Sequence, residues 1–306
     1  MRVLIIGYGS IAKKHHAALK KLRNDLTVYA LRSQKNQQEI EGVKSIYTWD
    51  EIPTDLNFII ISNPTSEHAK SIIEASKLNV PLFIEKPPLF HLTEKNNVLN
   101  ALTNRQIVTY CAFPLRFHPV IQWLKNNLNP SEILEFRAYC GSFLPDWRPA
   151  DDYRKNYSAI KELGGGVHLD LIHELDYLKW IFGLPKSSKG FTKKVSNLEI
   201  DSIDSASYFL EYESKMGVVQ LNYFRKQAKR TFEYVTNEDS FLADLLNYTV
   251  TNSKGEMIFE SEKTKTDLYL QQMSYFIEHI ENKSTLMNSF EDSIETLTVC
   301  LNVEVL

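Results

Sequence analysis

The chain contains 306 residues, of which 43% are hydrophobic and 24% are charged, and its formal net charge is -3. This length exceeds what one hydrophobic core usually serves, and the ordinary composition excludes a largely disordered chain, so we expect two globular domains. The small net charge provides no general attraction for nucleic acid or for an acidic membrane surface. It therefore favours a small molecule as the partner.

The cysteines and the N-terminal segment indicate the compartment. Cys111, Cys140 and Cys300 show neither a CxxC pair nor the spacing of metal ligands, so we expect no disulfide scaffold and no metal site. The apolar run at residues 3–6 is too short for a signal sequence or for a span of a bilayer. These features predict a cytoplasmic protein.

Residues 1–118 alternate between short apolar runs and stretches of helical periodicity. The run at 57–62 is apolar enough to be buried on both faces, as the central strands of a parallel sheet are. Such alternation predicts a doubly wound parallel sheet. The predicted strands are 2–6, 26–31, 57–62, 80–85 and 107–111, and the predicted helices are 11–22, 66–78 and 94–102.

Residues 119–306 have a different pattern, in which longer runs with period-two alternation indicate antiparallel strands with one wetter face. We expect an α+β domain that carries a large, mainly antiparallel open sheet and serves substrate binding and oligomerisation. Burial of the open face against a second copy would give a homodimer or homotetramer. The predicted helices are 120–128, 167–182, 267–281 and 290 to the C-terminus, and the predicted strands are 133–140, 206–213, 217–224, 231–236, 239–247 and 249–252.

A glycine-rich turn separates the first predicted strand from the first predicted helix. Its sequence, Gly7-Tyr8-Gly9-Ser10-Ile11-Ala12, has the form GxGxxA. In a dinucleotide site the first glycine makes the turn, the second lets the backbone approach the pyrophosphate, and the helix N-terminus attracts the phosphates. A plain tight turn is the alternative, but the position between strand and helix favours cofactor binding by Gly7, Gly9, Ser10, Ile11 and Ala12. Residues 1–118 are therefore predicted to be an NAD(P)-binding Rossmann domain.

The end of the second predicted strand bears on the choice of cofactor. NAD-specific sites place an acidic residue there to accept the ribose hydroxyls, whereas this chain has Arg32 and Ser33. A guanidinium and a hydroxyl can pair with a 2′-phosphate. Between NADP and NAD, the sequence therefore favours NADP.

Three further motifs follow in order: Ser62-Asn63-Pro64-Thr65-Ser66-Glu67-His68, Glu85-Lys86-Pro87, and Gly164-Gly165-Gly166 before Asp170 and His173. Over nearly the whole chain, their order and spacing resemble the glucose-fructose oxidoreductase and inositol dehydrogenase (Gfo/Idh/MocA) family. The resemblance implies that Lys86 contacts cofactor and substrate beside the nicotinamide, often before a cis proline. It also implies cofactor contacts from Ser62, Asn63, Pro64, Thr65, His68 and Glu85.

The second catalytic motif departs from the family pattern, because many relatives have three residues between the aspartate and the histidine, whereas only Leu171 and Ile172 separate Asp170 from His173. A branch that resembles enzymes of surface-polysaccharide sugar synthesis has the short spacing. It also has the sequences found here at Asp146-Trp147-Arg148-Pro149, Asp152-Tyr153-Arg154 and His173-Glu174-Leu175-Asp176-Tyr177.

Hydride transfer belongs to the cofactor, so the protein must move one proton to or from the substrate oxygen. His173 titrates near neutrality and, with carboxylates at helical spacing, suits a general acid or base; a structural histidine is the alternative. Lys86 would share the proton or polarise the oxygen. Asp170 would orient His173, bind a substrate hydroxyl or face solvent.

A cluster of cations and aromatic residues suits an anionic sugar derivative, because guanidinium groups hold phosphate or carboxylate bidentately. An ordinary loop with solvated charges is the alternative. The candidate substrate-binding residues are Lys86, Arg116, Trp147, Arg148, Tyr153, Arg154, Asp170 and His173.

Together these features predict an NAD(P)-dependent dehydrogenase or reductase that moves a hydride between nicotinamide and a hydroxyl or keto carbon of a sugar or nucleotide sugar. One alternative is a redox-neutral epimerase or glycosidase in which the cofactor is reduced only transiently. Another is a non-catalytic dinucleotide sensor, which would have little use for Lys86 and His173 together.

Overall fold

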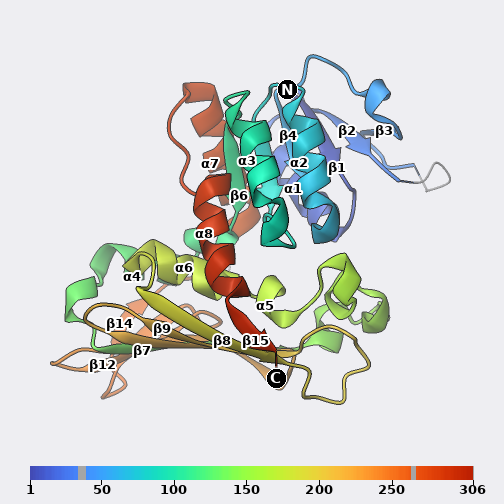
Figure 1. Ribbon diagram of the computed structural model, residues 1–306. Helices are drawn as coiled ribbons and strands as arrows, with labels where there is room; N and C mark the ends of the chain where they lie inside the picture. Colours follow the sequence, from blue (N-terminus) through green and yellow to red (C-terminus); the bar gives the residue numbers. More distant parts are fainter. Residues whose placement is uncertain (34–38, 263–266, 306) are drawn as a thin grey trace. The chain divides into compact units, whose positions relative to one another are not determined.

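The computed structural model describes residues 1–33, 39–262 and 267–305. The chain forms two compact units that are not continuous in sequence (Figure 1). The first consists of Met1–Pro114 and Asp267–Ile294, and the second of Leu115–Thr266 and Glu295–Leu306. The boundary near the C-terminus falls within helix α8 (Phe290–Leu301).

The first unit is built on a six-stranded parallel sheet in the order β3-β2-β1-β4-β5-β6. This is the strand order of dinucleotide-binding folds, in which ligands bind beyond the carboxyl ends of the strands where the order reverses, here between β1 and β4. The strands are β1 (Arg2–Ile6), β2 (Thr27–Leu31), β3 (Val43–Ile46), β4 (Phe58–Ile61), β5 (Leu82–Glu85) and β6 (Thr109–Ala112).

Helices cover this sheet because its central strands are apolar on both faces; all four residues of β4 are fully buried. Helix α1 (Ser10–Leu22) packs against α7 (Leu268–Asn282), and both contribute to a core with alternate residues of the strands. Helices α2 (His68–Ser76) and α3 (Lys95–Thr103) pack against each other. The short 3-10 helices are η1 (Trp49–Glu51), η2 (Thr65–Glu67) and η3 (Leu92–Glu94).

The second unit contains a nine-stranded sheet in the order β14-β13-β12-β11-β7-β10-β9-β8-β15. Two pairings, β7 with β10 and β8 with β15, are parallel, and the others are antiparallel. The predicted fold class is therefore confirmed. The strands are β7 (Glu135–Phe143), β8 (Ser187–Lys193), β9 (Ser205–Glu211), β10 (Met216–Asn222), β11 (Phe224–Val235), β12 (Ser240–Asp244), β13 (Thr249–Asn252), β14 (Met257–Glu260) and β15 (Val303–Val305).

Helices α4 (Pro119–Asn127), α5 (Val167–Asp170) and α6 (His173–Phe182) lie on one side of this sheet (Figure 1). Phe136 of β7 stacks on Phe182 of α6, with 4.9 Å between ring centroids. The remaining short helices are η4 (Pro114–Phe117), η5 (Pro130–Glu132), η6 (Leu144–Trp147), η7 (Tyr153–Lys155), η8 (Tyr157–Ala159) and η9 (Lys161–Leu163).

The prediction of one continuous helix over residues 167–182 is wrong. The helix is interrupted after Asp170, because Leu171 leaves the helical region with φ -100° and ψ 26°, and α6 begins anew at His173. Helical spacing between Asp170 and His173 therefore does not describe their geometry. Strands β3, β8, β14 and β15 were not predicted, and β8 (SSKGFTK) illustrates why, since it lacks a regular apolar alternation.

Candidate active site

The glycine turn has the geometry that a dinucleotide site requires. Gly7 has φ +78°, and a Cβ atom there would lie 2.6 Å from Cα of Asn63, so only glycine fits. A Cβ atom on Gly9 would meet nothing within 4 Å. The space next to Gly9 at the start of α1 is thus open, as the approach of a pyrophosphate demands.

The N-terminus of α1 retains its attraction for an anion. Gly9 is the N-cap, no side chain caps the helix, and the first turn holds no acidic residue. The positive end of the helix dipole and its amide groups are therefore not neutralised by a carboxylate of the helix itself. Gly9 and Ser10 are exposed, Ile11 is half-buried and Ala12 is buried.

The segment after β4 is tied to this turn. The Ser62 hydroxyl donates to the carbonyl oxygen of Gly7 at 3.0 Å, and the Asn63 amide nitrogen donates to Ser71 Oγ at 2.8 Å. The side-chain oxygen of Asn63 is buried and accepts no hydrogen bond within the described residues. A buried acceptor beside the glycine turn fits a site that a polar ligand completes.

His68 joins the segment after β4 to the segment after β5. Its side chain is buried; Nδ1 lies 2.9 Å from the carbonyl oxygen of Pro87, and Nε2 lies 3.0 Å from that of Asn63. Burial lowers the pKa of His68, although both carbonyl oxygens favour the protonated ring. Since both ring nitrogens face the backbone, this geometry supports a positioning role for His68, and its predicted contact with cofactor stays a prediction.

Lys86 is half-buried, and the Lys86–Pro87 peptide bond is cis, as the resemblance implied. Glu85 is directed elsewhere: its carboxylate lies 2.5 Å from Nε2 of the fully buried His15 of α1. This contact anchors the end of β5 to α1, and sequence reasoning did not anticipate it. The remaining predicted residues of this unit are Pro64, which is exposed, and Thr65, which is buried in η2.

Arg32 follows β2 and donates from Nη1 to the hydroxyl of Ser45 in β3 at 3.2 Å. Its charge lowers the pKa of Tyr8 in the glycine turn, against the larger opposite effect of burial, so the guanidinium lies near that turn. Ser33 is exposed. A cation and hydroxyls thus stand where an NAD-specific site would have a carboxylate.

In the second unit, Asp170 is held by two phenols. Tyr157 and Tyr223 donate to its two carboxylate oxygens, each at 2.5 Å, and Asp170 is only 4% exposed. Burial and the charge of Asp170 raise the pKa of Tyr223, so this phenol stays protonated and acts as the donor. Of the three predicted roles, facing solvent does not fit this geometry.

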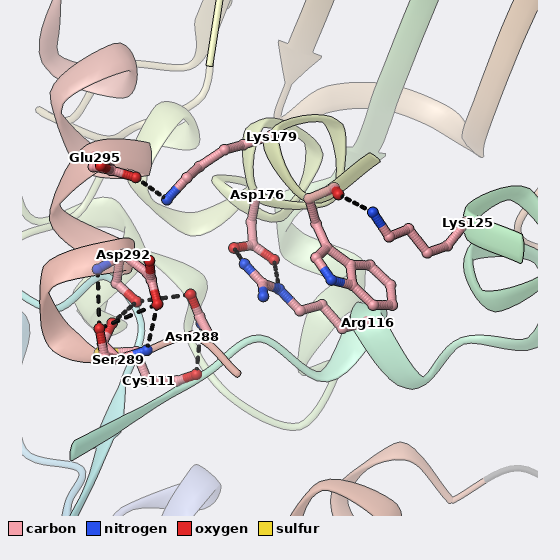
Figure 2. A network of polar contacts seen from close by, with 11 residues as sticks. Cys111, Arg116, Lys125, Asp176, Lys179, Asn288, Ser289, Asp292 and Glu295 are labelled. Atoms are coloured by element: carbon pink, nitrogen blue, oxygen red, sulfur yellow. Dashed lines mark hydrogen bonds and ion pairs between the residues drawn. The ribbon is translucent and has the colours of Figure 1, made fainter. Parts of the chain in front are cut away.

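His173 is the first residue of α6 and is half-buried. Asp176, which shares its helix, forms a buried bidentate ion pair with Arg116 at 2.8 and 2.7 Å (Figure 2). The predicted substrate contact of Arg116 thus competes with an internal carboxylate. The pair fixes α6 against η4 and thereby positions the helix that carries His173.

The predicted sugar-binding loop is held by polar contacts of its own. Trp147 is partly exposed and donates to Ser142 Oγ at 2.8 Å, and Arg148 donates to the Asn156 side chain at 3.1 Å. Exposed Arg154 binds Asp152 at 2.8 and 3.0 Å and Glu199 at 3.1 Å. Tyr153 accepts from the backbone nitrogen of Glu199.

His168, which sequence reasoning did not consider, lies two residues before Asp170. Burial lowers its pKa to about 4, against the opposite effect of the Asp170 charge. Its Nδ1 atom is buried without a hydrogen-bond partner in the described residues. The ring is therefore neutral at neutral pH, and only its nearness to Asp170 in sequence could have drawn attention to it.

Two family models match the chain. The model described as oxidoreductase family, NAD-binding Rossmann fold, matches residues 1–113, and that of the GFO/IDH/MocA C-terminal domain matches residues 131–254. Together with the strand order and the glycine turn, they define an oxidoreductase with an NAD-binding Rossmann domain. The chain belongs to the Gfo/Idh/MocA family.

The chain is also similar to curated oxidoreductases and dehydrogenases. The chain is 27% identical over 223 residues to the uncharacterized oxidoreductase YrbE of Bacillus subtilis strain 168, a match that spans 69% of this chain and 63% of that protein. It is 24% identical over 327 residues to D-glucoside 3-dehydrogenase of Escherichia coli strain K12, across 95% of this chain and 91% of the relative.

Solved structures show the same fold. UDP-N-acetylglucosamine 3-dehydrogenase GnnA from Acidithiobacillus ferrooxidans aligns with a TM-score of 0.79 at 17% identity, over 99% of this chain and 96% of the other. Levoglucosan dehydrogenase in complex with NADH aligns with a TM-score of 0.81 at 17% identity, over 99% and 95%. Among the helices of the described residues, none has the length and hydrophobicity needed to cross a membrane.

Proposed function

We propose that this oxidoreductase is an NAD(P)-dependent dehydrogenase or reductase acting on a hydroxyl or keto carbon of a sugar or nucleotide sugar. The observation that carries the proposal is the glycine turn. Position 7 accepts only glycine, because its φ is positive and a side chain there would clash with Asn63. The space next to Gly9 is open and adjoins the N-terminus of α1, which no side chain caps. A turn that only connected a strand to a helix would not require that open approach.

A bound nicotinamide supplies or accepts the hydride, and the chain's own residues handle the accompanying proton. Lys86 polarises the reacting oxygen, and His173 gives or takes the proton as general acid or base. Asp170, held as an acceptor by Tyr157 and Tyr223, binds a substrate hydroxyl or orients His173.

The substrate class follows from what the relatives are named for. They include a D-glucoside 3-dehydrogenase, a levoglucosan dehydrogenase and a UDP-N-acetylglucosamine 3-dehydrogenase, all acting on carbohydrate carbons. Sugar hydroxyls donate to carboxylates and accept from cations and other donors. The residues that we assign to the substrate are Lys86, Asp170, His173, Trp147, Arg148, Tyr153 and Arg154.

To test the proposed roles, Lys86 and His173 are each replaced by alanine, and the wild type and both variants are assayed on nucleotide sugars and free sugars with NADPH and NADH. Each variant should lose about 10²- to 10⁴-fold in turnover while its affinity for dinucleotide stays nearly unchanged. Lys70→Ala and His91→Ala, at exposed positions of the first unit, are the controls. Unchanged turnover in both variants would refute the roles. Substrate conversion without net change in reduced cofactor would identify the redox-neutral alternative, and dinucleotide binding without any conversion would identify the sensor.

For the cofactor we propose NADP over NAD, on the position of Arg32 beside the glycine turn and its bond to Ser45. Replacement of Arg32 by Asp should shift the ratio of specificity constants toward NAD by about tenfold or more, because a carboxylate accepts ribose hydroxyls and repels a 2′-phosphate. Lys44→Asp, an exposed charge change on the neighbouring strand, is the control. An unaltered ratio would reject the contact.

We also propose a cytoplasmic homodimer or homotetramer that buries the open face of the nine-stranded sheet. Phe209, Met216, Leu242 and Met257 are between 41% and 54% exposed on strands of this sheet, and an apolar surface of this kind favours association. The mass of the protein in solution tests the proposal.

A further inference from the structure

Two buried histidines hold the segment Glu85-Lys86-Pro87 from two different helices. His15 of α1 is fully buried, and its Nε2 atom lies 2.5 Å from Oε1 of Glu85. His68, the first residue of α2, meets the carbonyl oxygen of Pro87 through Nδ1 at 2.9 Å. Lys86 thus stands between two residues that are each fixed by an imidazole ring.

The surroundings of the His15 ring are aromatic. Phe83 and Tyr269 lie edge-on to it, with 4.9 and 5.9 Å between the ring centroids. Its Nδ1 atom is buried and has no hydrogen-bond partner within the described residues, so the ring directs its polar contact to Glu85. Because a carboxylate accepts, Nε2 carries the proton and donates it.

The Glu85 carboxylate connects His15 to the backbone of the next residue. Glu85 is only 7% exposed, and while Oε1 faces His15, Oε2 accepts from the backbone nitrogen of Lys86 at 3.3 Å. The carboxylate therefore bridges α1 and the peptide unit from which the Lys86 side chain extends. A change at His15 reaches Lys86 through this bridge.

The contact spans the two strand ends that a dinucleotide would join. The glycine turn follows β1 and Lys86 follows β5, and β4 lies between these two strands in the sheet. Neighbouring strands are about 4.8 Å apart, so the two ends are separated by about 10 Å. Since α1 begins at the glycine turn and carries His15, the bond to Glu85 fixes this separation.

A role in stability alone does not require a histidine here. Taking an imidazole and a carboxylate out of water costs free energy, and a buried polar pair is often no more stabilising than apolar residues of similar volume. A leucine would suit the aromatic surroundings of Phe83 and Tyr269. An apolar side chain cannot, however, supply a directed bond that orients the Glu85 carboxylate.

We propose that His15 is a positioning residue for the reaction, whose bond to Glu85 holds Lys86 at the distance from the glycine turn at which its ammonium meets the reacting oxygen. The inference rests on the function proposed above, because it concerns the role assigned there to Lys86. It assigns to His15 an effect on turnover. Dinucleotide affinity should change little, because Gly7, Gly9 and the first amide groups of α1 stay as they are.

Three substitutions at position 15 test the bond. His15→Leu removes it, His15→Gln keeps a donor near the place of Nε2, and His15→Asn places its amide near Nδ1, too far back to reach Glu85. Turnover is measured at saturating dinucleotide, on the best substrate of the assay described above, and is expressed per bound dinucleotide so that unfolded protein does not count.

His15→Leu and His15→Asn should each lose about 10- to 100-fold in turnover, because a displacement of about 1 Å in a reacting group can cost this much. His15→Gln should stay within about threefold of the wild type, and the affinity of all three variants for NADPH should change by less than about threefold. Rescue by glutamine but not by asparagine is not expected of a residue that only fills space.

Two comparisons control for indirect effects. His279→Leu makes the same replacement at a half-buried histidine of α7 in the same unit, whose Nδ1 faces the carbonyl oxygen of Tyr275, and its turnover should match the wild type. The second comparison uses the Lys86→Ala variant as the background. Because His15 acts through Lys86, His15→Leu should cause no further loss of turnover there.

Three outcomes would overturn the inference alone, given a loss in Lys86→Ala. These are wild-type turnover in His15→Leu and His15→Asn, a loss in His15→Gln as large as in those two variants, and an equal loss from His15→Leu with and without Lys86. Wild-type turnover in Lys86→Ala would instead overturn the proposed role of Lys86, and this inference with it. If His15→Leu does not fold, the contrast between His15→Gln and His15→Asn decides.

Discussion

At the residue scale, the two glycines of the first turn differ in what surrounds the position of their missing side chains. Glycine is needed at position 7 because φ is positive there and because a Cβ atom would lie 2.6 Å from Cα of Asn63. Contacts within the protein are thus sufficient to explain Gly7. Gly9 has an ordinary φ of -86° and open space around its missing side chain, so nothing within the described chain requires glycine there. We therefore expect the benefit of glycine at this position to come from the ligand that approaches it.

Alanine substitutions at the two glycines should therefore have different effects on stability and on dinucleotide binding. Gly9→Ala should leave the free energy of unfolding within about 0.5 kcal/mol of wild type, yet reduce dinucleotide affinity by about tenfold or more, because its methyl group enters the space for the pyrophosphate. Gly7→Ala should destabilise the protein by more than about 1 kcal/mol, through positive φ and the clash with Asn63. Urea denaturation and dinucleotide titration measure both effects. Full dinucleotide affinity in Gly9→Ala would remove the main support for the proposed cofactor site.

At the element scale, helix α4 depends on a neutral histidine. The backbone nitrogen of Val120 donates to Nδ1 of the N-cap residue His118 at 3.3 Å, and Nε2 lies 3.0 Å from the carbonyl oxygen of Leu245. Only a neutral ring with its proton on Nε2 satisfies both bonds. Burial, with a smaller contribution from the charge of Arg230, lowers the pKa of His118 to about 4.

The stability of the protein should therefore fall in acid. An unfolded chain binds a proton at His118 below about pH 6.5, whereas the folded chain resists until about pH 4, so stability is complete above 6.5 and declines as the pH falls toward 4. The loss is at most about 3 kcal/mol for this group. His118→Asn keeps a capping oxygen and does not titrate, so its stability should depend less on pH over this range in urea denaturation. Parallel pH curves for variant and wild type would show that the ring is not the titrating group.

Element prediction succeeded where a local pattern carries the information. The apolar run of β4 and the strand, turn and helix at residues 2–22 were predicted within one or two residues. The break between α5 and α6 was missed, because the residues from Val167 to Phe182 keep an apolar periodicity through Leu171 and only backbone geometry reveals the interruption.

At the scale of the whole molecule, helix α7, from the C-terminal part of the chain, completes the N-terminal unit. Phe276 is fully buried and contacts the rings of Phe58, Phe83 and Tyr110, which belong to three strands of the parallel sheet. Salt bridges Arg23–Glu281 and Lys21–Asp267 add surface contacts between α1 and the α7 segment. The dinucleotide-binding unit is thus assembled from both ends of the chain.

Removal of the Phe276 ring should destabilise the first unit. Phe276→Ala should lower the free energy of unfolding by about 3–5 kcal/mol, because it leaves a cavity among aromatic rings, and dinucleotide binding should be lost at a lower urea concentration. Val108→Ala, at a residue of the same unit that is 47% exposed, is the control and should cost little. If Phe276→Ala left the dinucleotide-binding transition unchanged, α7 would not stabilise this unit.

The sequence by itself determined the class of fold, the glycine turn and the order of the family motifs, because each depends on residues close together in the chain. Only the tertiary structure decided which partners those residues take. His15 reaches Glu85, Tyr223 reaches Asp170, Arg116 binds Asp176, and α7 joins a core more than 150 residues before it. Contacts over such separations follow from how whole elements pack, and no local spacing encodes them.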